Sequence, residues 1–525
     1  MNVAEAILTR GQDSALAILH GDALLTYAEL RDAVARFAGG LLERGHRRGG
    51  RIGIFAENGP FFVKAYLGII RAGLVAVPLP ADATAELFAR IVADAGITEV
   101  FVSTSRLNLA QSWAEKAGVK LVAQDDEKNF TGDLRLPPAA VNPARDLASL
   151  MFTSGSTGAP KGVMITHRNI ACNSHSIIAY LGLYPRDRAM VVLPFHYCFG
   201  LSLLHTHLMA GASLVLNNEF RLFPESVLAE MQQKECTGFA GVPSTYQILL
   251  RNSRFRQMVF PRLRLFQQAG GKLPNPCIRE IVDSFPAAQF FLMYGQTEAT
   301  ARLSYLPPKR LADKLGSIGK GLPATKLEVL RADGQPVAPG SDEVGEIVAS
   351  GDNIASGYWR APAETAKYFR DGKLHTGDLA RVDADGFIFI VEREREMIKS
   401  GGNRISAKEV EDVIAEIPEV VEVAVIGAPH ELLGESIKVF VSPAAGTALA
   451  PRDVMAHCRR RLPAAKAPEE IIFLDHLPHN GSGKVLKPKL KELLALRQHE
   501  SPPRNGKVFP GGGAEDNPQE LEISA

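Results

Sequence analysis

The residues best suited to chemistry form a run of small and hydroxylated side chains around a lysine, TSGSTGAPKG (153–162). Small residues let backbone N–H groups approach phosphate oxygens closely, while hydroxyls and a lysine add hydrogen bonds and positive charge. The run therefore predicts a phosphate-binding loop, although its spacing is not that of a Walker A motif. A Ser/Gly-rich surface loop without chemistry is the alternative that this composition leaves open. The residues expected to contact phosphate are Thr153, Ser154, Gly155, Ser156, Thr157, Gly158 and Lys161.

The elements around this run have the rhythm of an α/β fold. RIGIFAE (51–57) reads as a buried strand, a helix follows near residues 61–72, and LVAVPL (74–79) reads as a second strand. A strand, a helix and a strand at this spacing predict a βαβ unit and a parallel sheet. A capping box formed by Thr26 and Glu29 predicts the start of an earlier helix, which runs through residue 42. Further strands are expected at 99–103, 121–123, 190–194 and 213–216.

The chain is expected to form two domains and a tail, because 525 residues exceed what a single core supports. Residues 1–393 are predicted to form a large domain with parallel-rich sheets and flanking helices. Residues 394–497 are predicted to form a small α+β domain, and residues 498–525, rich in Pro, Gly and polar side chains, a disordered tail. The small domain is expected to contain helices near 407–415 and 451–462 and strands near 421–427 and 438–443.

The bulk composition excludes several classes of protein. The net charge of +1 implies no attraction to nucleic acid or to a membrane surface. The five cysteines are scattered and form no CxxC pair, which excludes a disulfide framework and a zinc ribbon and fits the reducing cytoplasm. The N-terminus lacks a basic region that leads into an apolar core, and the apolar stretches end well before 18 residues. Neither a signal peptide nor a transmembrane helix is therefore expected.

TSGSTGAPKG resembles the phosphate-binding loop of the adenylate-forming superfamily, which contains acyl-CoA synthetases, adenylation domains of peptide synthetases and firefly luciferase. The resemblance extends over residues 20–492, and its motifs occur in the family's order. Each motif is moderately specific, and five in the correct order leave little room for coincidence. The other four are AYLGIIRAGLVAVPL (65–79), YGQTEAT (294–300), TGDLARVDADGFIFIVERERE (376–396) and PHNGSGKVLK (478–487).

The resemblance implies a set of nucleotide contacts. Tyr294 corresponds to the ring against the adenine, Thr297 to a phosphate-contacting hydroxyl and Glu298 to the carboxylate that binds Mg²⁺. Asp378 corresponds to the acceptor from both ribose hydroxyls, and Arg393 to an arginine at the ribose and phosphate. A core tyrosine, a surface glutamate, a turn aspartate and a solvated arginine are the bland alternatives. The remaining expected contacts are Gly295 and Gln296 and, from a looser match, Ala269, Gly270 and Gly271.

The resemblance also assigns the catalytic lysine. Lys484 in GSGK lies on a loop of the small domain and is expected to reach the substrate carboxylate and the α-phosphate, where its charge stabilises the phosphorus centre. Thr297 and Glu298 complete the expected catalytic set. A carboxylate is already ionised at neutral pH, so its attack on the α-phosphorus needs no general base. The sequence accordingly offers no compelling Ser/His/Asp or Cys/His constellation.

A second half-reaction requires a thiol. In the family the small domain rotates about a hinge residue, which corresponds here to Arg395, where aspartate or lysine is more usual. After rotation, residues 399–403 would line the pantetheine tunnel, with Gly401 and Gly402 allowing close approach. The thiol is that of coenzyme A or of the phosphopantetheine arm of an acyl carrier protein.

The acyl pocket is expected to include the segment 193–207, with His196 and Tyr197 as wall residues. A purely structural role for His196 is equally open. Peptide-synthetase adenylation domains place an aspartate near this segment to bind an α-amino group, but residues 192–218 contain no acidic side chain. An aliphatic or aryl acid is therefore favoured over an α-amino acid.

These features together predict an AMP-forming ligase that uses ATP and Mg²⁺ to activate a small carboxylic acid and then transfers the acyl group to coenzyme A. A ligase that loads a carrier protein, an oxidase of the luciferase type and a nucleotide-binding protein without catalysis are the alternatives. Lys484, Glu298, Asp378 and Arg393 are all present, which argues against the last. The sequence leaves the acid and the oligomeric state open, a homodimer included.

Overall fold

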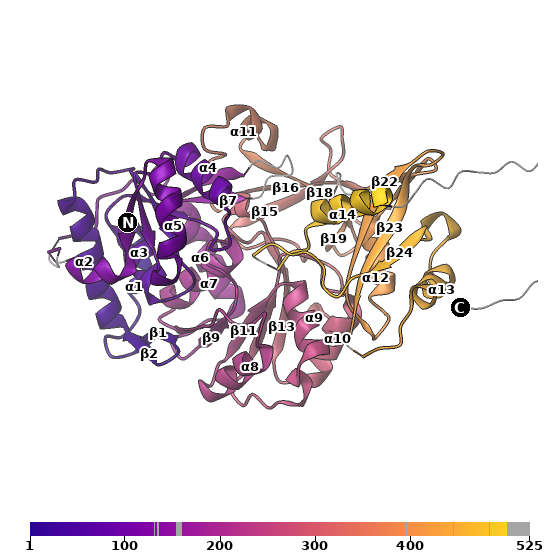
Figure 1. The fold of residues 1–525 in the computed structure, drawn as a ribbon, viewed down its shortest axis with the longest axis horizontal. Coiled ribbons are helices and arrows are strands. Elements are labelled where there is room, and N and C mark those ends of the chain that lie inside the picture. The colour runs from indigo at the N-terminus through magenta and orange to yellow at the C-terminus, as the bar shows by residue number, and fades with distance from the viewer. Residues whose placement is uncertain are drawn as a thin grey trace, which may run out of the picture.

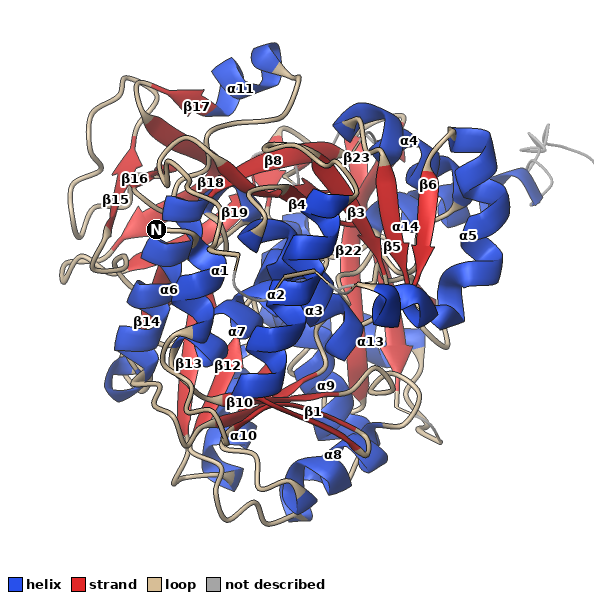
Figure 2. Cartoon of the chain, turned by 90° about the vertical axis from the view of Figure 1, so that its left-hand side faces the viewer, coloured by secondary structure: helices blue, strands red, loops and turns tan. Residues whose placement is uncertain are grey.

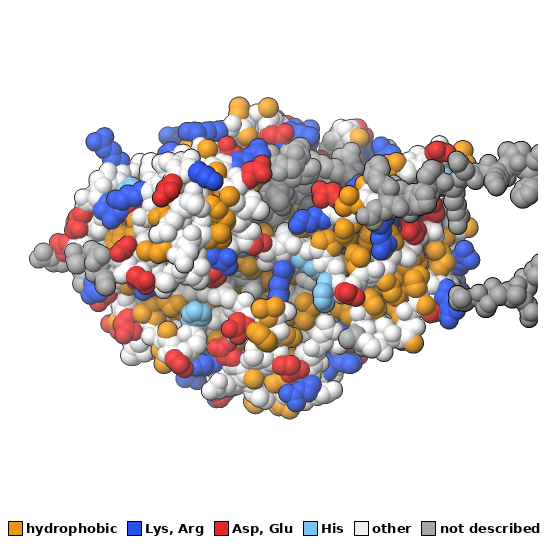
Figure 3. Space-filling view, viewed as in Figure 1, with side chains coloured by type: hydrophobic (Ala, Val, Ile, Leu, Met, Phe, Trp, Pro, Cys, Tyr) orange, Lys and Arg blue, Asp and Glu red, His pale blue; other side chains and the backbone are white. Residues whose placement is uncertain are grey.

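The computed structural model describes residues 1–130, 132–133, 136–153, 160–393, 397–444, 446–481 and 483–500. This part of the chain contains four β-sheets with flanking helices, arranged from the N-terminal sheets to the C-terminal sheet in Figure 1. The α/β class expected from the sequence is confirmed. None of the helices in these ranges is long and apolar enough to cross a membrane. Basic and acidic side chains are interspersed on the face shown in Figure 3, consistent with a net charge of +1.

The first sheet contains the predicted βαβ unit. Strand β3 (Arg51–Phe55) is parallel to β4 (Val75–Pro78), and helix α3 (Pro60–Arg71) joins them, with a proline at the first helical position. The other elements are α4 (Ala85–Ala95), β5 (Glu99–Val102), α5 (Thr104–Ala117), β6 (Lys120–Ala123), β7 (Leu147–Thr153) and β8 (Lys161–Thr166). The strand order is β6-β5-β3-β4-β7-β8, and only β7 and β8 are antiparallel.

The second sheet has eight strands. The strands are β1 (Leu16–His20), β2 (Ala23–Thr26), β9 (Arg188–Val191), β10 (Ser213–Leu216), β11 (Gly238–Gly241), β12 (Leu265–Gln268), β13 (Gln289–Tyr294) and β14 (Ser304–Leu306). Their order is β14-β13-β12-β11-β9-β10-β1-β2, antiparallel only at the two edges. The strands expected near 190–194 and 213–216 are thus confirmed as β9 and β10.

A layer of helices packs between these two sheets. The principal core joins apolar side chains of both sheets to those of five helices, and Figure 2 shows α2, α3 and α7 in that layer. The predicted capping box exists at the start of α2, where Thr26 N–H donates to Glu29 Oε2 at 2.8 Å. The helices of this layer are α1 (Val3–Leu8), α2 (Tyr27–Glu43), α3, α6 (His167–Leu181) and α7 (Cys198–Met209). Helices α8 (Pro224–Gln233), α9 (Pro243–Asn252) and α10 (Asn275–Ser284) cover the other face of the eight-stranded sheet.

A third, antiparallel sheet follows, which the hydrophobic rhythm of the sequence did not predict as a unit. It contains β15 (Thr325–Leu330), β16 (Gly345–Gly351), β17 (Phe369–Arg370), β18 (Lys373–Val382) and β19 (Ile388–Arg393), with helix α11 (Pro362–Tyr368) beside it. Strand β19 leads directly into residues 394–396, which lie outside the described ranges.

The fourth sheet lies at the C-terminal end of the chain. Its strands are β20 (Ile398–Ser400), β21 (Asn403–Ile405), β22 (Val420–His430), β23 (Gly434–Pro443) and β24 (Glu470–Phe473). Its helices are α12 (Ala407–Ile414), α13 (Pro451–Arg461) and α14 (Lys487–Glu500). The predicted helices and strands of this region are confirmed. Helix α14 continues past residue 498, where the tail was expected to begin, and residues 501–525 lie outside the described ranges.

Candidate active site

Tyr294 and Asp378 are 84 positions apart in the chain and are joined directly in the fold. Tyr294 is the last residue of β13 and Asp378 lies within β18, and the Tyr294 hydroxyl donates a hydrogen bond of 2.5 Å to Asp378 Oδ2. Both side chains are buried. In the β18–β19 ladder Asp378 is opposite the main chain of Arg393, whose side chain lies outside the described residues. Three positions expected at the nucleotide therefore converge.

The segment after Tyr294 folds back on itself. A Cβ on Gly295 would lie 2.0 Å from the carbonyl oxygen of Ala301, so glycine is required there. Residues Thr297–Ala299 form a 3₁₀ turn, and Thr300 has a φ of +67°, a strained value for a β-branched residue. The Thr300 hydroxyl stabilises this turn through a hydrogen bond of 2.8 Å to the Asn353 carbonyl oxygen. The turn lies at the carboxyl edge of the sheet, where open α/β folds bind ligands.

Glu298 is oriented by a residue that sequence reasoning missed. The Tyr358 hydroxyl donates a hydrogen bond of 2.7 Å to Glu298 Oε1. Tyr358 forms an isolated antiparallel β-bridge with Val163 of β8, the strand that begins at Lys161. The GYWR sequence around Tyr358 resembles no motif used above, and only the fold reveals its proximity to Glu298.

The base of the predicted phosphate loop is the β7–β8 ladder, in which Thr153 pairs with Lys161. The Lys161 ammonium group forms an ion pair with Glu364 and lies 5.7 Å from the centre of the Tyr358 ring. The loop residues themselves, Ser154, Gly155, Ser156, Thr157 and Gly158, lie outside the described residues. The geometry thus places the two ends of the loop, but not its phosphate contacts, beside Glu298.

The expected adenine-contacting residues follow β12, which pairs with β13 in parallel. Gly270 has a φ of +86°, and a Cβ there would lie 2.9 Å from Val242 Cγ1. Gln268 Nε2 donates a hydrogen bond of 2.8 Å to the Gly271 carbonyl oxygen. Because β12 and β13 end at one edge of the sheet, Ala269, Gly270 and Gly271 lie on the same edge as Tyr294.

The turn that carries Lys484 is docked on the large N-terminal part of the molecule. Arg221 Nη2 donates a hydrogen bond of 2.7 Å to the Asn480 carbonyl oxygen, and Ser244 Oγ donates one of 2.7 Å to that of Gly483. A Cβ on Gly481 would lie 2.7 Å from Asp82 Oδ2. Lys484 is exposed on this turn, and its backbone N–H donates to Asn480 Oδ1 at 2.9 Å. The contacts of Asn480, Gly481 and Gly483 therefore hold the lysine turn against the sheet edge that carries the residues expected at the nucleotide.

The expected acyl-pocket residues precede α7. His196 is 6% exposed, its Nε2 has no hydrogen-bond partner among the described residues, and its ring lies 4.3 Å from that of Tyr197. Burial lowers the pKa of His196 to about 4, although Asp82 acts in the opposite direction. His196 is therefore neutral at physiological pH. Asn58, also missed by sequence reasoning, fixes this segment by donating to the Leu193 carbonyl oxygen at 2.8 Å.

Cys198, the first residue of α7, does not supply a nucleophile. Burial raises the pKa of its thiol despite a hydrogen bond with Thr297, so the thiol stays protonated. Cys198 is therefore not a candidate for covalent catalysis.

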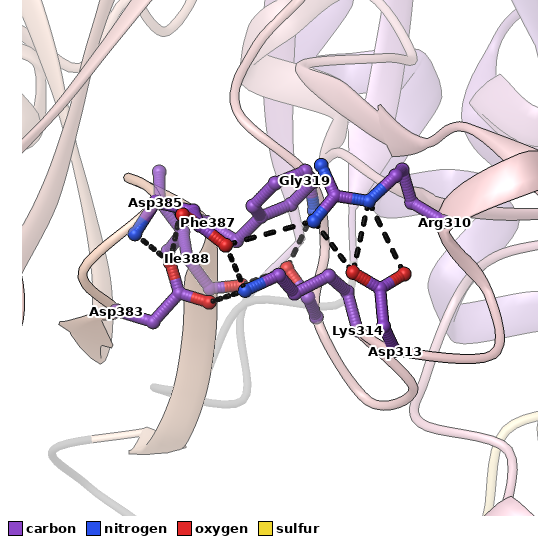
Figure 4. A network of polar contacts seen from close by, with 9 residues as sticks. Arg310, Asp313, Lys314, Gly319, Asp383, Asp385, Phe387 and Ile388 are labelled. Atoms are coloured by element: carbon purple, nitrogen blue, oxygen red, sulfur yellow. Dashed lines mark hydrogen bonds and ion pairs between the residues drawn. The ribbon is translucent and has the colours of Figure 1, made fainter.

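Ion pairs and a cation–ring contact stabilise the turn that precedes β19, the strand before the expected hinge. Lys314 forms ion pairs with Asp383 and Asp385 at 2.7 and 2.6 Å, and Arg310 lies 4.7 Å from the centre of the Phe387 ring. Figure 4 shows this network around the turn between β18 and β19. Arg395, the expected hinge, lies outside the described residues. Gly401 and Gly402 form the β20–β21 turn, with φ values of +54° and +78°, and Gly401 N–H donates to the Leu433 carbonyl oxygen at 2.9 Å.

Comparison with known proteins decides what this site belongs to. The model of the AMP-binding enzyme family matches residues 5–359, and that of the AMP-binding enzyme C-terminal domain matches residues 409–484. The chain belongs to the AMP-binding enzyme family. Among its relatives, the feruloyl-CoA synthase of Amycolatopsis sp is 36% identical over 479 residues, which cover 91% of this chain and 95% of that one. The long-chain-fatty-acid–CoA ligase of Salmonella typhimurium is 30% identical in an alignment 532 positions long, which covers 93% of each chain.

A solved structure supports the same assignment. The o-succinylbenzoate CoA synthetase of Bacillus subtilis, in complex with its acyl-adenylate intermediate, is similar with a TM-score of 0.83 and 28% identity, over 93% of this chain and 98% of that one. The ligase described here accordingly forms an acyl-AMP from a carboxylic acid and transfers the acyl group to coenzyme A.

Proposed function

We propose a specific division of labour among the residues of this AMP-forming acid–CoA ligase. The observation that carries the proposal is the docking of the Lys484 turn through Asn480 and Gly483 onto Arg221 and Ser244. In this arrangement the lysine turn and the Tyr294–Glu298 segment belong to one site, as acyl-AMP formation requires.

Adenylation begins with an ionised carboxylate, whose oxygen attacks the α-phosphorus of ATP in line as pyrophosphate leaves. Tyr294 provides a surface for the adenine ring, and Asp378 accepts hydrogen bonds from the ribose hydroxyls. Lys484 stabilises the negative charge that develops on the phosphorus centre. All reacting groups are anionic, so catalysis consists mainly of positioning and charge neutralisation.

Glu298 is the residue that would hold Mg²⁺. The described residues contain no group of three or more His, Cys, Asp or Glu side chains that could enclose a metal ion. One carboxylate fits Mg²⁺, because this ion binds oxygen, keeps several waters and is commonly shared with substrate phosphates. The bound ion would neutralise phosphate charge. The Tyr358 hydroxyl fixes the orientation of the Glu298 carboxylate that would receive it.

Thioester formation uses a second orientation of the C-terminal sheet, reached by rotation at Arg395. Gly401 and Gly402 then line the path of the thiol, since their backbone allows close approach. We assign coenzyme A as the acceptor, because the relatives named above are CoA ligases. A carrier-protein arm presents the same phosphopantetheine thiol and is one outcome of the test below.

We further propose that the boundary between the two domains lies between residues 393 and 394. We also propose that the protein acts in the cytoplasm. The part of the chain that the structure describes holds five free cysteines and no disulfide, which suits a reducing compartment. We also retain a homodimer as a proposal.

The function is tested by mass spectrometry of the products formed from ATP, Mg²⁺ and a panel of fatty, aryl, dicarboxylic and amino acids, with and without coenzyme A. An acyl-CoA product supports the whole proposal. Acyl-AMP without a thioester keeps the adenylation and assigns the thiol to a carrier protein. The absence of adenylate with every acid would contradict the function.

Lys484→Ala tests the lysine. We expect adenylation to fall by about 10²-fold or more, because a charge aimed at the transition state is removed. ATP binding, measured by calorimetry, should persist. Lys489→Ala, an exposed lysine on α14, serves as the matched control and should leave adenylation unchanged. An active Lys484→Ala variant would refute the assignment.

A further inference from the structure

Arg302 is a buried cation with no counter-ion among the residues that the structure describes. Its side chain is 1% exposed, and its Nε and Nη2 atoms have no hydrogen-bond partner among the described residues. The guanidinium also forms no ion pair in that part of the chain. An arginine stays charged in proteins, and an unpaired buried charge is strongly unfavourable. Such a group therefore requires an explanation.

The position of Arg302 connects the reaction turn to the acyl segment. A Cβ on Gly295 would lie 2.8 Å from Arg302 Cα, so the residue backs directly onto the turn that carries Thr297 and Glu298. Its carbonyl oxygen accepts hydrogen bonds from Asn173 Nδ2 at 2.8 Å and from Asn353 Nδ2 at 3.0 Å. The backbone of Arg302 is thus fixed from two sides.

The guanidinium points into the region of the expected acyl pocket. Its central carbon lies 4.5 Å from the centre of the Phe199 ring. Phe199 is the second residue of α7, the helix that begins directly after His196 and Tyr197. Burial raises the pKa of the nearby Tyr180 phenol, and the charge of Arg302 and a side-chain hydrogen bond with it act in the opposite direction. These neighbours are neutral, so none of them balances the charge.

The two free donors have a defined geometry. Nε–H and one N–H of Nη2 point in the same direction along one side of a guanidinium, and this pair binds both oxygens of a carboxylate. A second unpaired side chain supports a polar ligand on the same face of the sheet. Gln267 is 1% exposed with neither amide atom partnered among the described residues, and it lies beside Phe291, whose ring is 5.9 Å from that of Tyr180.

We propose that Arg302 binds a second carboxylate of the acid substrate, distant from the carboxylate that is adenylated. The inference rests on the proposed function and makes the substrate class a dicarboxylic acid. When such an acid binds, its distal carboxylate accepts the two N–H groups and neutralises the buried charge. An acid with only one carboxylate leaves these two N–H groups unpaired and is disfavoured, because the loss of a required hydrogen-bond partner costs far more than the loss of an apolar contact.

The test compares acids in matched pairs by ATP–pyrophosphate exchange. Butanoate with succinate, hexanoate with adipate and benzoate with isophthalate differ only in the second carboxylate. We expect the wild-type enzyme to prefer the dicarboxylate in at least one pair by about tenfold or more in kcat/KM. Arg302→Met should lower kcat/KM for that dicarboxylate by about 10²-fold or more, leave the KM for ATP unchanged and leave the monocarboxylate within about threefold.

Two further variants sharpen the comparison. Arg302→Lys keeps the charge but not the planar pair of donors, so it should recover only part of the dicarboxylate activity. Arg186→Met removes an exposed arginine and should change neither member of any pair.

Three outcomes would decide against the inference. If the wild-type enzyme prefers the monocarboxylate in every pair, the second-carboxylate site is wrong while the ligase function stands, and this result needs no variant. Equal losses for both acids of a pair in Arg302→Met would make Arg302 a structural residue or a partner of the reacting carboxylate. No exchange with any acid of any class would refute the proposed function itself, and the inference with it.

Discussion

At the scale of single residues, unusual environments mark the site better than residue types do. Thr300 has a positive φ, Gly295 admits no side chain, and Arg302 is buried with no counter-ion in the part of the chain that the structure describes. All three lie within residues 295–302, directly after Tyr294, where the sequence resembles the family's adenine and magnesium motif. Strain and unpaired polar groups persist in folded proteins where the surroundings compel them, which is common at functional sites.

Several buried histidines of the helical layer make stability depend on pH. Burial lowers the pKa of His205 from 6.5 to about 3, and His205 Nε2 lies 2.9 Å from the Tyr66 hydroxyl. The unfolded chain binds a proton at a higher pH than the folded one, so the contribution of this group is complete above pH 6.5 and is lost as the pH falls towards 3. At about pH 5 the loss amounts to about 2 kcal/mol.

His205→Gln should therefore reduce the drop in melting temperature between about pH 7.5 and pH 5, since glutamine still hydrogen-bonds Tyr66 but takes up no proton. Thermal melts of both proteins at the two pH values give the comparison. The exposed His175→Gln variant should melt with the wild-type pH dependence. An unchanged pH dependence in His205→Gln would show that His205 does not contribute.

At the scale of elements, the candidate site lies where the ends of several strands meet the turn that carries Lys484, which belongs to the C-terminal part of the chain. Strands β12 and β13 carry Gly270 and Tyr294 to one edge of the sheet, and β18 adds Asp378 from a different sheet. The turn of residues 478–485 approaches this edge from the C-terminal sheet and is fixed there by Arg221 and Ser244. These two contacts are made by side chains to backbone oxygens, so each can be removed singly.

Arg221→Ala and Ser244→Ala should each slow acyl-AMP formation by about three- to tenfold, the effect of one net hydrogen bond. Conversion of supplied acyl-AMP to acyl-CoA should remain at the wild-type rate, because that step uses the other orientation of the C-terminal sheet. Single-turnover kinetics of the two steps separate these effects. Equal slowing of both steps would mean that the contacts stabilise the fold rather than this orientation. Arg186→Ala, an exposed arginine without a role here, is the control.

At the scale of the whole molecule, the proposed mechanism uses two arrangements of the same chain. The structure shows one of them, in which the C-terminal sheet lies against α9 and the Lys484 turn faces the sheet edge (Figure 1). An ion pair between Lys272 and Asp412 of α12 adds to this contact. Polar contacts of this kind are individually weak, which suits an interface that the proposed rotation would open.

A disulfide across this interface should trap the first arrangement. A Cβ on Gly481 would lie 3.0 Å from Asp82 Cγ, so Asp82→Cys with Gly481→Cys places two Cβ atoms at about 4.5 Å or less, within the range that a disulfide spans. The oxidised double variant should form acyl-AMP and lose thioester formation, and a reductant should restore it. Each single variant serves as a reference. Thioester formation by the fully oxidised protein would exclude the rotation.

Much of the fold was predictable because it depends on local patterns. A few consecutive residues are enough to indicate buried strands with continuous apolar sequence, such as β3 and β4, and the capping box of Thr26. The third sheet was not predicted as a unit, since its strands are antiparallel and partly polar. Tyr358, Asn58 and Arg302 were missed for a related reason, because nothing in their neighbouring sequence indicates their partners.

The sequence by itself determined the reaction, because the loop, strand and lysine motifs that handle ATP are short and each keeps its chemistry within a few residues. Only the tertiary structure decided how those motifs meet, with Tyr294 bound to Asp378 and the Lys484 turn seated on Ser244. It also revealed that Arg302 is buried and has no counter-ion among the described residues, since these properties depend on segments more than a hundred residues away, such as the start of α7 and Asn173. Chemistry carried by contiguous residues can be read from a sequence, whereas specificity created by distant neighbours requires the fold.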